Sequence, residues 1–107
     1  MARCLYNSDF ATFLYTDSAS IYRILDDNYH GEALTTTRDA WKAEIDIMKN
    51  VVSSLNNVDG QIIFEYDIPR LGKRIDVVLL YRGVVFCLEF KVGESKILET
   101  NIDQVLD

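Results

Sequence analysis

Two stretches of apolar, mostly β-branched residues predict a β-hairpin in the second half of the chain. They span residues 74–81 and 84–91, and only the dipeptide Arg82-Gly83 separates them. A two-residue loop that ends in glycine is typical of a tight hairpin, in which Tyr81 faces Val84. The two strands are almost continuously apolar, which predicts that helices cover them on both faces.

Residues 38–56 show the helical period instead. At about 100° per residue, one continuous arc is apolar and the other side is polar. The apolar arc contains Ala40, Trp41, Ile45, Ile47, Met48, Val51, Val52 and Leu55. The threonines at 35–37 offer an N-cap. Glu44 is the exception, because it projects near the middle of the apolar arc, where a carboxylate is costly unless it is paired or binds a metal.

The remaining segments are shorter. Residues 8–14 are consistent with a short helix capped by Ser8, and residues 18–25 with a second one. His30 is expected to be an exposed residue at a helix end and not a ligand. Residues 61–68 form a predicted strand between a turn at 56–60 and a loop at 69–72. A helix carrying Gln104 is predicted to begin near Leu98.

The hairpin places three chemically active residues together. Facing residues in its register sum to the same total, so Asp76 falls opposite Glu89, with Cβ atoms about 5 Å apart. Lys91 is two residues past Glu89 and therefore shares its face. Two like charges directly opposed in a sheet are destabilising. A divalent cation with oxygen ligands would turn the repulsion into a binding site.

The pattern D-x12-E-x-K resembles the active-site signature of the PD-(D/E)XK nuclease superfamily, the restriction-endonuclease-like fold. The closer resemblance is to the nuclease-like segment before a helicase-type ATPase domain in some uncharacterised bacterial proteins. The matching runs are residues 64–79, 86–94 and 102–105, and the likeness covers roughly residues 5 to 107. It implies that Asp76 and Glu89 hold Mg²⁺ or Mn²⁺ and that Lys91 helps to activate the attacking water.

The resemblance also implies further site residues. Glu44 matches an acidic residue on the helix before the sheet, and Gln104 matches a glutamine on the helix after it. The backbone carbonyl of Phe90 is a third expected metal ligand. For Glu44 the alternative is a buried pair with a lysine or arginine.

These expectations define an α/β fold with a partial restriction-endonuclease-like core. The core contains a helix, a three-stranded antiparallel meander and the start of a second helix. It spans residues 38–107, after an N-terminal helical segment at 1–37, and is expected to be truncated at its C-terminus. The chain is thus interpreted as a fragment, which should be weak as a nuclease by itself and should form a homodimer through its uncovered sheet face.

Composition narrows the function further. The chain has 107 residues, a net charge of −6 and two cysteines, Cys4 and Cys87. It contains neither a secretory leader nor an apolar run long enough to span a membrane, so a cytoplasmic location is expected. The negative net charge argues against electrostatic binding of nucleic acid over a large surface. However, Arg70, Lys73 and Arg74 form a small basic cluster that could bind backbone phosphate or could simply be a solvated turn.

The leading hypothesis is therefore a metal-dependent nuclease domain that hydrolyses DNA, with RNA as an open alternative, next to a fused or separate helicase-type ATPase. The runner-up is a non-catalytic module of the same fold that docks other proteins. A third hypothesis is a purely structural fragment in which Glu89 and Lys91 form a surface pair.

Overall fold

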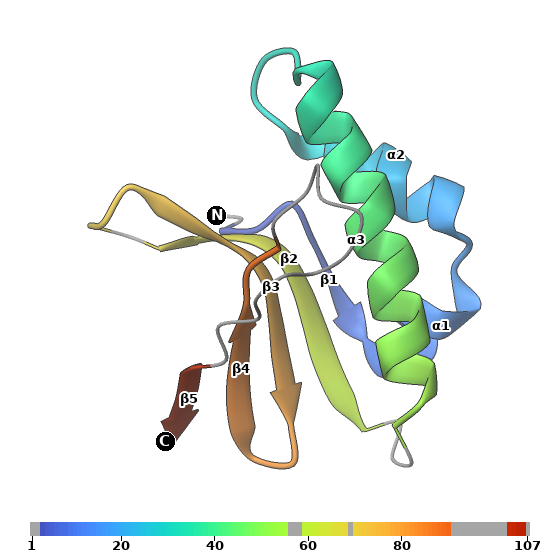
Figure 1. The fold of residues 1–107 in the computed structure, drawn as a ribbon, viewed down its shortest axis with the longest axis vertical. Helices are drawn as coiled ribbons and strands as arrows, with labels where there is room; N and C mark the ends of the chain where they lie inside the picture. The colour runs from blue at the N-terminus through green and yellow to red at the C-terminus, as the bar shows by residue number, and fades with distance from the viewer. Residues whose placement is uncertain (1–2, 56–58, 69, 91–102, 107) are drawn as a thin grey trace.

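The computed structural model describes residues 3–55, 59–68, 70–90 and 103–106. The strands in this part of the chain are β1 (Tyr6–Asp9), β2 (Gly60–Ile68), β3 (Lys73–Tyr81), β4 (Val84–Leu88) and β5 (Asp103–Leu106). The helices are α1 (Phe10–Tyr15), α2 (Ser18–Asn28) and α3 (Thr35–Ser53). The described residues form a mixed α/β structure, with one antiparallel sheet in the order β1-β2-β3-β4-β5 and the helices beside one face of it (Figure 1).

The predicted meander forms the centre of this sheet. Strand β2 pairs with β3 from Gly60↔Tyr81 to Ile68↔Lys73. Strand β3 pairs with β4 from Tyr81↔Val84 to Val77↔Leu88, which confirms the predicted hairpin and its register. The loop residues Arg82 and Gly83 both have positive φ, at 55° and 79°. Two successive residues with positive φ match the type I′ turn that suits the twist of a hairpin.

The core lies between α3 and the sheet, as the helical pattern predicts. Its most deeply buried residues on α3 and the central strands have 2% of their surface exposed or less. They are Trp41, Ile45, Met48 and Val52 on α3, and Ile62, Phe64 and Val77 on the sheet. Each large apolar side chain buried in this way contributes about 1.5–3 kcal/mol to stability. This packing holds α3 above the middle strands, where the candidate site lies.

The start of the chain differs from the prediction. The sequence predicts a helical segment over residues 1–37, but Tyr6–Asp9 form strand β1, which pairs with β2 through Tyr6↔Phe64. The short helix α1 follows directly. Its N-cap is Asp9, whose carboxylate accepts a hydrogen bond from the Thr12 N–H at 2.7 Å, so the prediction of Ser8 as cap is wrong. Ser8 belongs to the strand because pairing with β2 gives the backbone N–H and C=O groups of this segment hydrogen-bond partners.

The other helices need smaller corrections. Helix α2 extends to Asn28, and His30 is exposed beyond it, as expected. Helix α3 begins at Thr35 and ends at Ser53, three residues earlier at each end than predicted. Its N-cap is Leu34, which makes no side-chain capping bond, so the predicted threonine cap is wrong. None of the helices in the described ranges is long and apolar enough to cross a membrane.

The predicted helix around Gln104 is wrong for the residues that the structure describes. Asp103–Leu106 form strand β5, in which Gln104 pairs with Phe86 of β4. An unpaired edge strand exposes a row of backbone N–H and C=O groups, and a further strand satisfies them. The meander is thus extended on both sides, by β1 next to β2 and by β5 next to β4.

Candidate functional site

Asp76 lies on β3, at the point where the pairing with β4 ends. The last residue pair of that ladder is Val77↔Leu88, so one further step would place Asp76 opposite Glu89, as predicted. At this step the Phe90 backbone N–H donates a hydrogen bond of 2.9 Å to Asp76 Oδ2. Burial raises the pKa of Asp76, and the charge of Glu89 raises it further, although the Phe90 hydrogen bond opposes both effects. The carboxylate of Asp76 is therefore tied to the strand end that carries Glu89.

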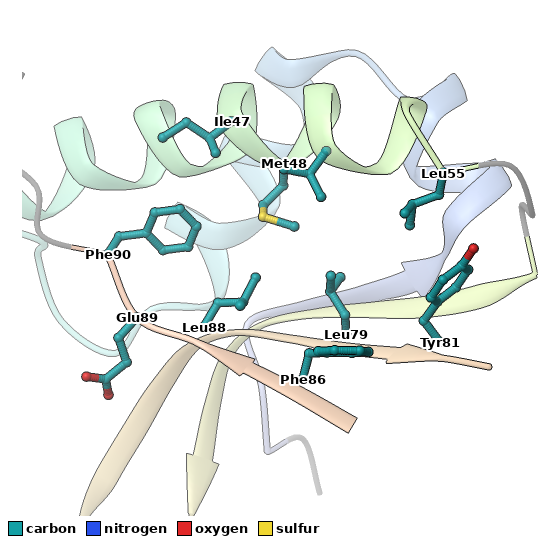
Figure 2. A pocket seen from close by; sticks show the side chains of 10 residues that line it. Ile47, Met48, Leu55, Leu79, Tyr81, Phe86, Leu88, Glu89 and Phe90 are labelled. Atoms are coloured by element: carbon teal, nitrogen blue, oxygen red, sulfur yellow. The ribbon is translucent and has the colours of Figure 1, made fainter. Parts of the chain in front are cut away.

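Glu89 itself is exposed. Figure 2 shows the Leu88 and Phe90 side chains directed toward α3, whereas the Glu89 carboxylate points away from α3. Its effect on the pKa of Asp76 nevertheless shows that the two charges interact. The two predicted metal ligands therefore lie at the same end of the β3–β4 pairing, with Glu89 on the solvent side.

Glu44 is the buried member of the group. It lies on α3 with only 3% of its surface exposed, and its Oε1 atom has no hydrogen-bond partner. Burial raises the pKa of Glu44 to about 9, and the charges of Asp76 and Glu65 contribute to the rise. The prediction that Glu44 is buried and does not face solvent is confirmed, whereas its direction toward Asp76 stays a prediction. Among the described residues no lysine or arginine forms an ion pair with Glu44, so the alternative of a buried pair stays untested.

The sequence reasoning missed Glu65, which lies on β2 beside Asp76. Its neighbours pair as Phe64↔Val77 and Tyr66↔Ile75, which sets Glu65 opposite Asp76. Its φ of 56° is in the left-handed region, which is unusual for a glutamate inside a strand and costs about 1–3 kcal/mol. Such strain is often found at functional sites. Facing residues of β2 and β3 have numbers that sum to the same total, as do those of β3 and β4. This rule, which pairs Asp76 with Glu89, could also have paired Asp76 with Glu65.

Glu65 contacts groups on two other elements, α3 and β3. It accepts a hydrogen bond from the Trp41 side chain on α3, and its Oε1 lies 3.9 Å from Arg74 Nη1. The Arg74 guanidinium also lies over the Tyr29 ring, 5.7 Å from its centroid. Burial and the charge of Asp76 raise the pKa of Glu65 to about 7, although Arg74 and Trp41 oppose the rise. Glu65 is therefore held on the side of the sheet that faces α3.

The predicted basic cluster is divided by the structure. Arg70 and Lys73 are exposed at the β2–β3 turn, and Arg70 has a φ of 78°. Arg74 instead reaches back toward Glu65 and Tyr29. Arg70 and Lys73 remain available to a phosphate, whereas Arg74 neutralises part of the acidic group.

Two other predicted site residues cannot be placed by their side chains. Lys91 lies outside the described residues. Gln104 is described only through its backbone in β5, so its predicted position on a helix facing the site is wrong.

Two cavities flank the acidic group. The apolar one, of about 360 Å³, lies between α3 and the β3–β4 hairpin, and Figure 2 shows its lining. The polar one, of about 380 Å³, includes Glu65, Arg74, Tyr29 and Asn28 in its wall. Solvent and small ions can therefore approach Glu65 through a polar cavity.

The donors fit a hard divalent cation chemically, because carboxylate oxygens are the ligands that Mg²⁺ prefers. The partnerless Oε1 of Glu44 also has free lone pairs. However, within the described residues no three His, Cys, Asp or Glu side chains are already arranged as a metal site. A cation would have to draw the carboxylates closer together.

The acidic residues lie on successive elements: Glu44 on α3, Glu65 on β2, Asp76 on β3 and Glu89 after β4. Comparisons of the chain with protein-family models, with curated proteins and with solved structures find no match. The functional argument therefore depends on the acidic group itself.

Proposed function

We propose that this chain is a PD-(D/E)XK nuclease-like domain that hydrolyses DNA phosphodiester bonds with Mg²⁺ or Mn²⁺. The observation that carries the proposal is that Oε1 of Glu44 is buried without a hydrogen-bond partner. The charge of Asp76 also contributes to the raised pKa of this carboxyl group. A native protein rarely leaves a buried carboxylate oxygen without a partner, since the cost is several kcal/mol. A metal ion or a metal-bound water is a partner that would also offset the repulsion from Asp76.

Each residue has a role in this proposal. Asp76 and Glu89, with the Phe90 carbonyl, would hold the cation, and Glu44 would complete its surroundings from α3. A bound Mg²⁺ supplies charge for the phosphate and makes a hydroxide available near neutral pH. The Phe90 N–H fixes the orientation of Asp76 at 2.9 Å. Lys91 would orient the attacking water, and Arg70 and Lys73 would bind the DNA backbone.

The wider setting belongs to the same proposal. DNA is the expected substrate, with RNA as the alternative. A helicase-type ATPase, fused or separate, is the expected partner, and the cytoplasm is the expected location. The net charge of −6 limits how much DNA the domain can hold by itself, so most of the affinity would come from the partner.

The test is metal-dependent cleavage of single- and double-stranded DNA in Mn²⁺. Asp76→Asn and Lys91→Ala should each lower the rate by about 100-fold or more, because they remove a ligand and the charge beside the water. Asp46→Asn is the matched control, since Asp46 is an exposed carboxylate on α3. Cleavage that is equal in all variants would come from another site or a contaminant, and the nuclease assignment would then be abandoned.

A second candidate function is a non-catalytic module that docks a protein. The observation that favours it is the apolar cavity between α3 and the hairpin, which is lined by Met48, Leu79, Phe86 and Leu88 among others. An apolar cavity of this kind accepts a hydrophobic side chain of a partner. This candidate predicts that Asp76→Asn leaves every function of the protein unchanged, so the same experiment separates the two.

A further inference from the structure

The turn between β2 and β3 carries an apolar side chain at its apex. Leu71 is 64% exposed, and Figure 1 shows this turn projecting from the body of the molecule, away from the helices. A Cβ atom placed on the next residue, Gly72, would meet no atom beyond its chain neighbours within 4 Å, so the space around the apex is open. A single exposed leucine is ordinary on a protein surface, so its surroundings decide whether it has a role.

The backbone of the turn holds Leu71 in a specific way. The residues on both sides of it are in the left-handed region, Arg70 with a φ of 78° and Gly72 with a φ of 63°. Glycine adopts this conformation freely, whereas for an arginine it costs about 1–3 kcal/mol. The Leu71 N–H also donates a hydrogen bond of 3.4 Å to the Ile68 carbonyl. The turn therefore keeps a costly conformation that presents a leucine at its apex.

The apex is basic on an otherwise acidic chain. Arg70 and Lys73 are exposed beside Leu71, and neither forms an ion pair with a side chain in the described ranges. The exposed carboxylate of the same hairpin, Asp67, lies further back and pairs with Arg74 across the two strands. An apolar side chain between two cations matches the chemistry of nucleic acid, in which phosphates flank the apolar faces of stacked bases.

Leucine can act on DNA only through its shape. It has no hydrogen-bonding group with which to read a base edge, but proteins that kink or open a duplex insert apolar side chains, leucine among them, between base steps. Such insertion costs a few kcal/mol for unstacking, and the cost is lowest where the bases are already unpaired. The net charge of −6 also favours a short contact over a long duplex interface.

We propose that Leu71 is a wedge that inserts at the junction between duplex and single-stranded DNA, with Arg70 and Lys73 on the adjacent phosphates. The inference rests on the proposed function and deepens it, because it names forked DNA as the substrate. Leu71 precedes Asp76 by five residues, which span at most about 17 Å. Bases along one strand are about 3.4 Å apart, so cleavage should fall within about five nucleotides of the junction.

The experiment measures base stacking at the junction directly. A DNA fork with the fluorescent adenine analogue aminopurine at its last base pair is titrated with the 107-residue chain in EDTA. Aminopurine becomes brighter when it loses a stacked neighbour, so wild type should raise its fluorescence. Leu71→Ala should bind the fork about 10-fold more weakly and leave the base stacked, because the apolar side chain is lost. Leu71→Met should keep the signal, since methionine also serves as a wedge.

Two further sets of variants separate the wedge from general binding. Leu34→Ala removes a leucine that is 71% exposed at the start of α3, and it should behave as wild type. Arg70→Gln and Lys73→Gln should weaken binding to forked and single-stranded DNA alike and should each lower the salt dependence by about one phosphate contact.

The outcomes for the wedge and for the nuclease are distinct. If Leu71→Ala matches wild type in fluorescence and affinity, or weakens binding to single-stranded DNA as much as to the fork, the wedge is wrong although the proposed function stands. Mn²⁺-dependent cuts that fall only far from the junction would also contradict it. If wild type opens the fork through Leu71 and cleaves no DNA in Mn²⁺, the proposed function is wrong and the wedge stands. A chain that binds no fork would overturn the wedge.

Discussion

Glu44 is an acidic side chain on the apolar face of a helix, and its burial makes the stability of the fold depend on pH. Its pKa rises from an ordinary value of 4.5 to about 9 in the folded chain. Between these values the native state holds a proton that the unfolded state releases. The free energy of unfolding therefore falls as the pH rises from about 4.5 to 9, by up to about 1.4 kcal/mol per pH unit.

Urea unfolding at pH 6 and pH 8, in EDTA, checks this prediction. Wild type should lose about 2.5 kcal/mol or more between the two values, and Glu44→Gln should lose clearly less, because glutamine has no proton to release. Glu65, whose pKa is raised to about 7, contributes over part of the same range in both proteins. If both proteins lose the same stability, Glu44 is ionised in the folded state at pH 6 and the prediction fails.

The residues of the acidic group differ in how visible they are in the sequence. Asp76 and Glu89 can be paired because a two-residue loop fixes the register of a hairpin. Glu44 is visible as a charge among apolar neighbours. Glu65 escapes notice because four residues, 69–72, separate its strand from the next in the sequence, and a longer connection fixes the register of a hairpin less firmly than a two-residue loop. Its left-handed backbone has no signal in the sequence, since nothing in a glutamate favours it.

At the scale of elements, the tight turn of the hairpin depends on two residues with positive φ. A Cβ atom placed on Gly83, where φ is 79°, would have no atom beyond its chain neighbours within 4 Å, so a side chain there meets only the backbone restriction. Gly83→Ala should lower the free energy of unfolding by about 1 kcal/mol, because alanine is disfavoured at this φ. Arg82→Asn is the matched variant and should leave stability equal or higher, since asparagine suits this position. Chemical denaturation measures both, and a neutral Gly83→Ala would contradict the assigned turn.

The docking of α1 on α3 depends on one lysine. Lys49 on α3 donates hydrogen bonds to the backbone carbonyls of Phe13 and Thr16, at the C-terminal end of α1. Lys49→Met should lower the unfolding free energy by about 1 kcal/mol, because the carbonyls lose a charged donor while the apolar stem is kept. Lys42→Met is the control, as Lys42 is exposed and only approaches the Tyr22 ring, at 5.0 Å. Equal effects of the two substitutions in urea unfolding would remove this role from Lys49.

The elements at the two ends of the chain show the limit of local patterns. Tyr6–Asp9 and Asp103–Leu106 are short segments without a strong period, and each becomes a strand by pairing with an edge of the meander. Such pairing joins residues that are far apart in the sequence, such as Tyr6 and Phe64. The long helix α3 and the tight hairpin, whose signals are local, can be predicted with small errors at their ends.

At the scale of the whole molecule, the described helices lie beside one face of the sheet, and the opposite face carries apolar side chains (Figure 1). Leu79 lines the cavity beneath α3, so its neighbour Leu80 projects to the opposite face, where it is 37% exposed. Its strand neighbour Val85 is partly buried. Within the described ranges no helix lies on this face, and an uncovered apolar sheet face promotes association.

We therefore expect the chain to self-associate through the face that carries Leu80. Light scattering after size exclusion should show a mass that rises with concentration for wild type, and Leu80→Lys should shift the chain toward the monomer. Leu71→Lys is the matched control, because Leu71 lies at the β2–β3 turn and is 64% exposed. If Leu80→Lys and Leu71→Lys weaken association equally, the sheet face is not the contact. A wild-type chain that stays monomeric at about 100 μM would also reject a functional dimer, because hydrophobic interfaces of stable dimers hold at far lower concentrations.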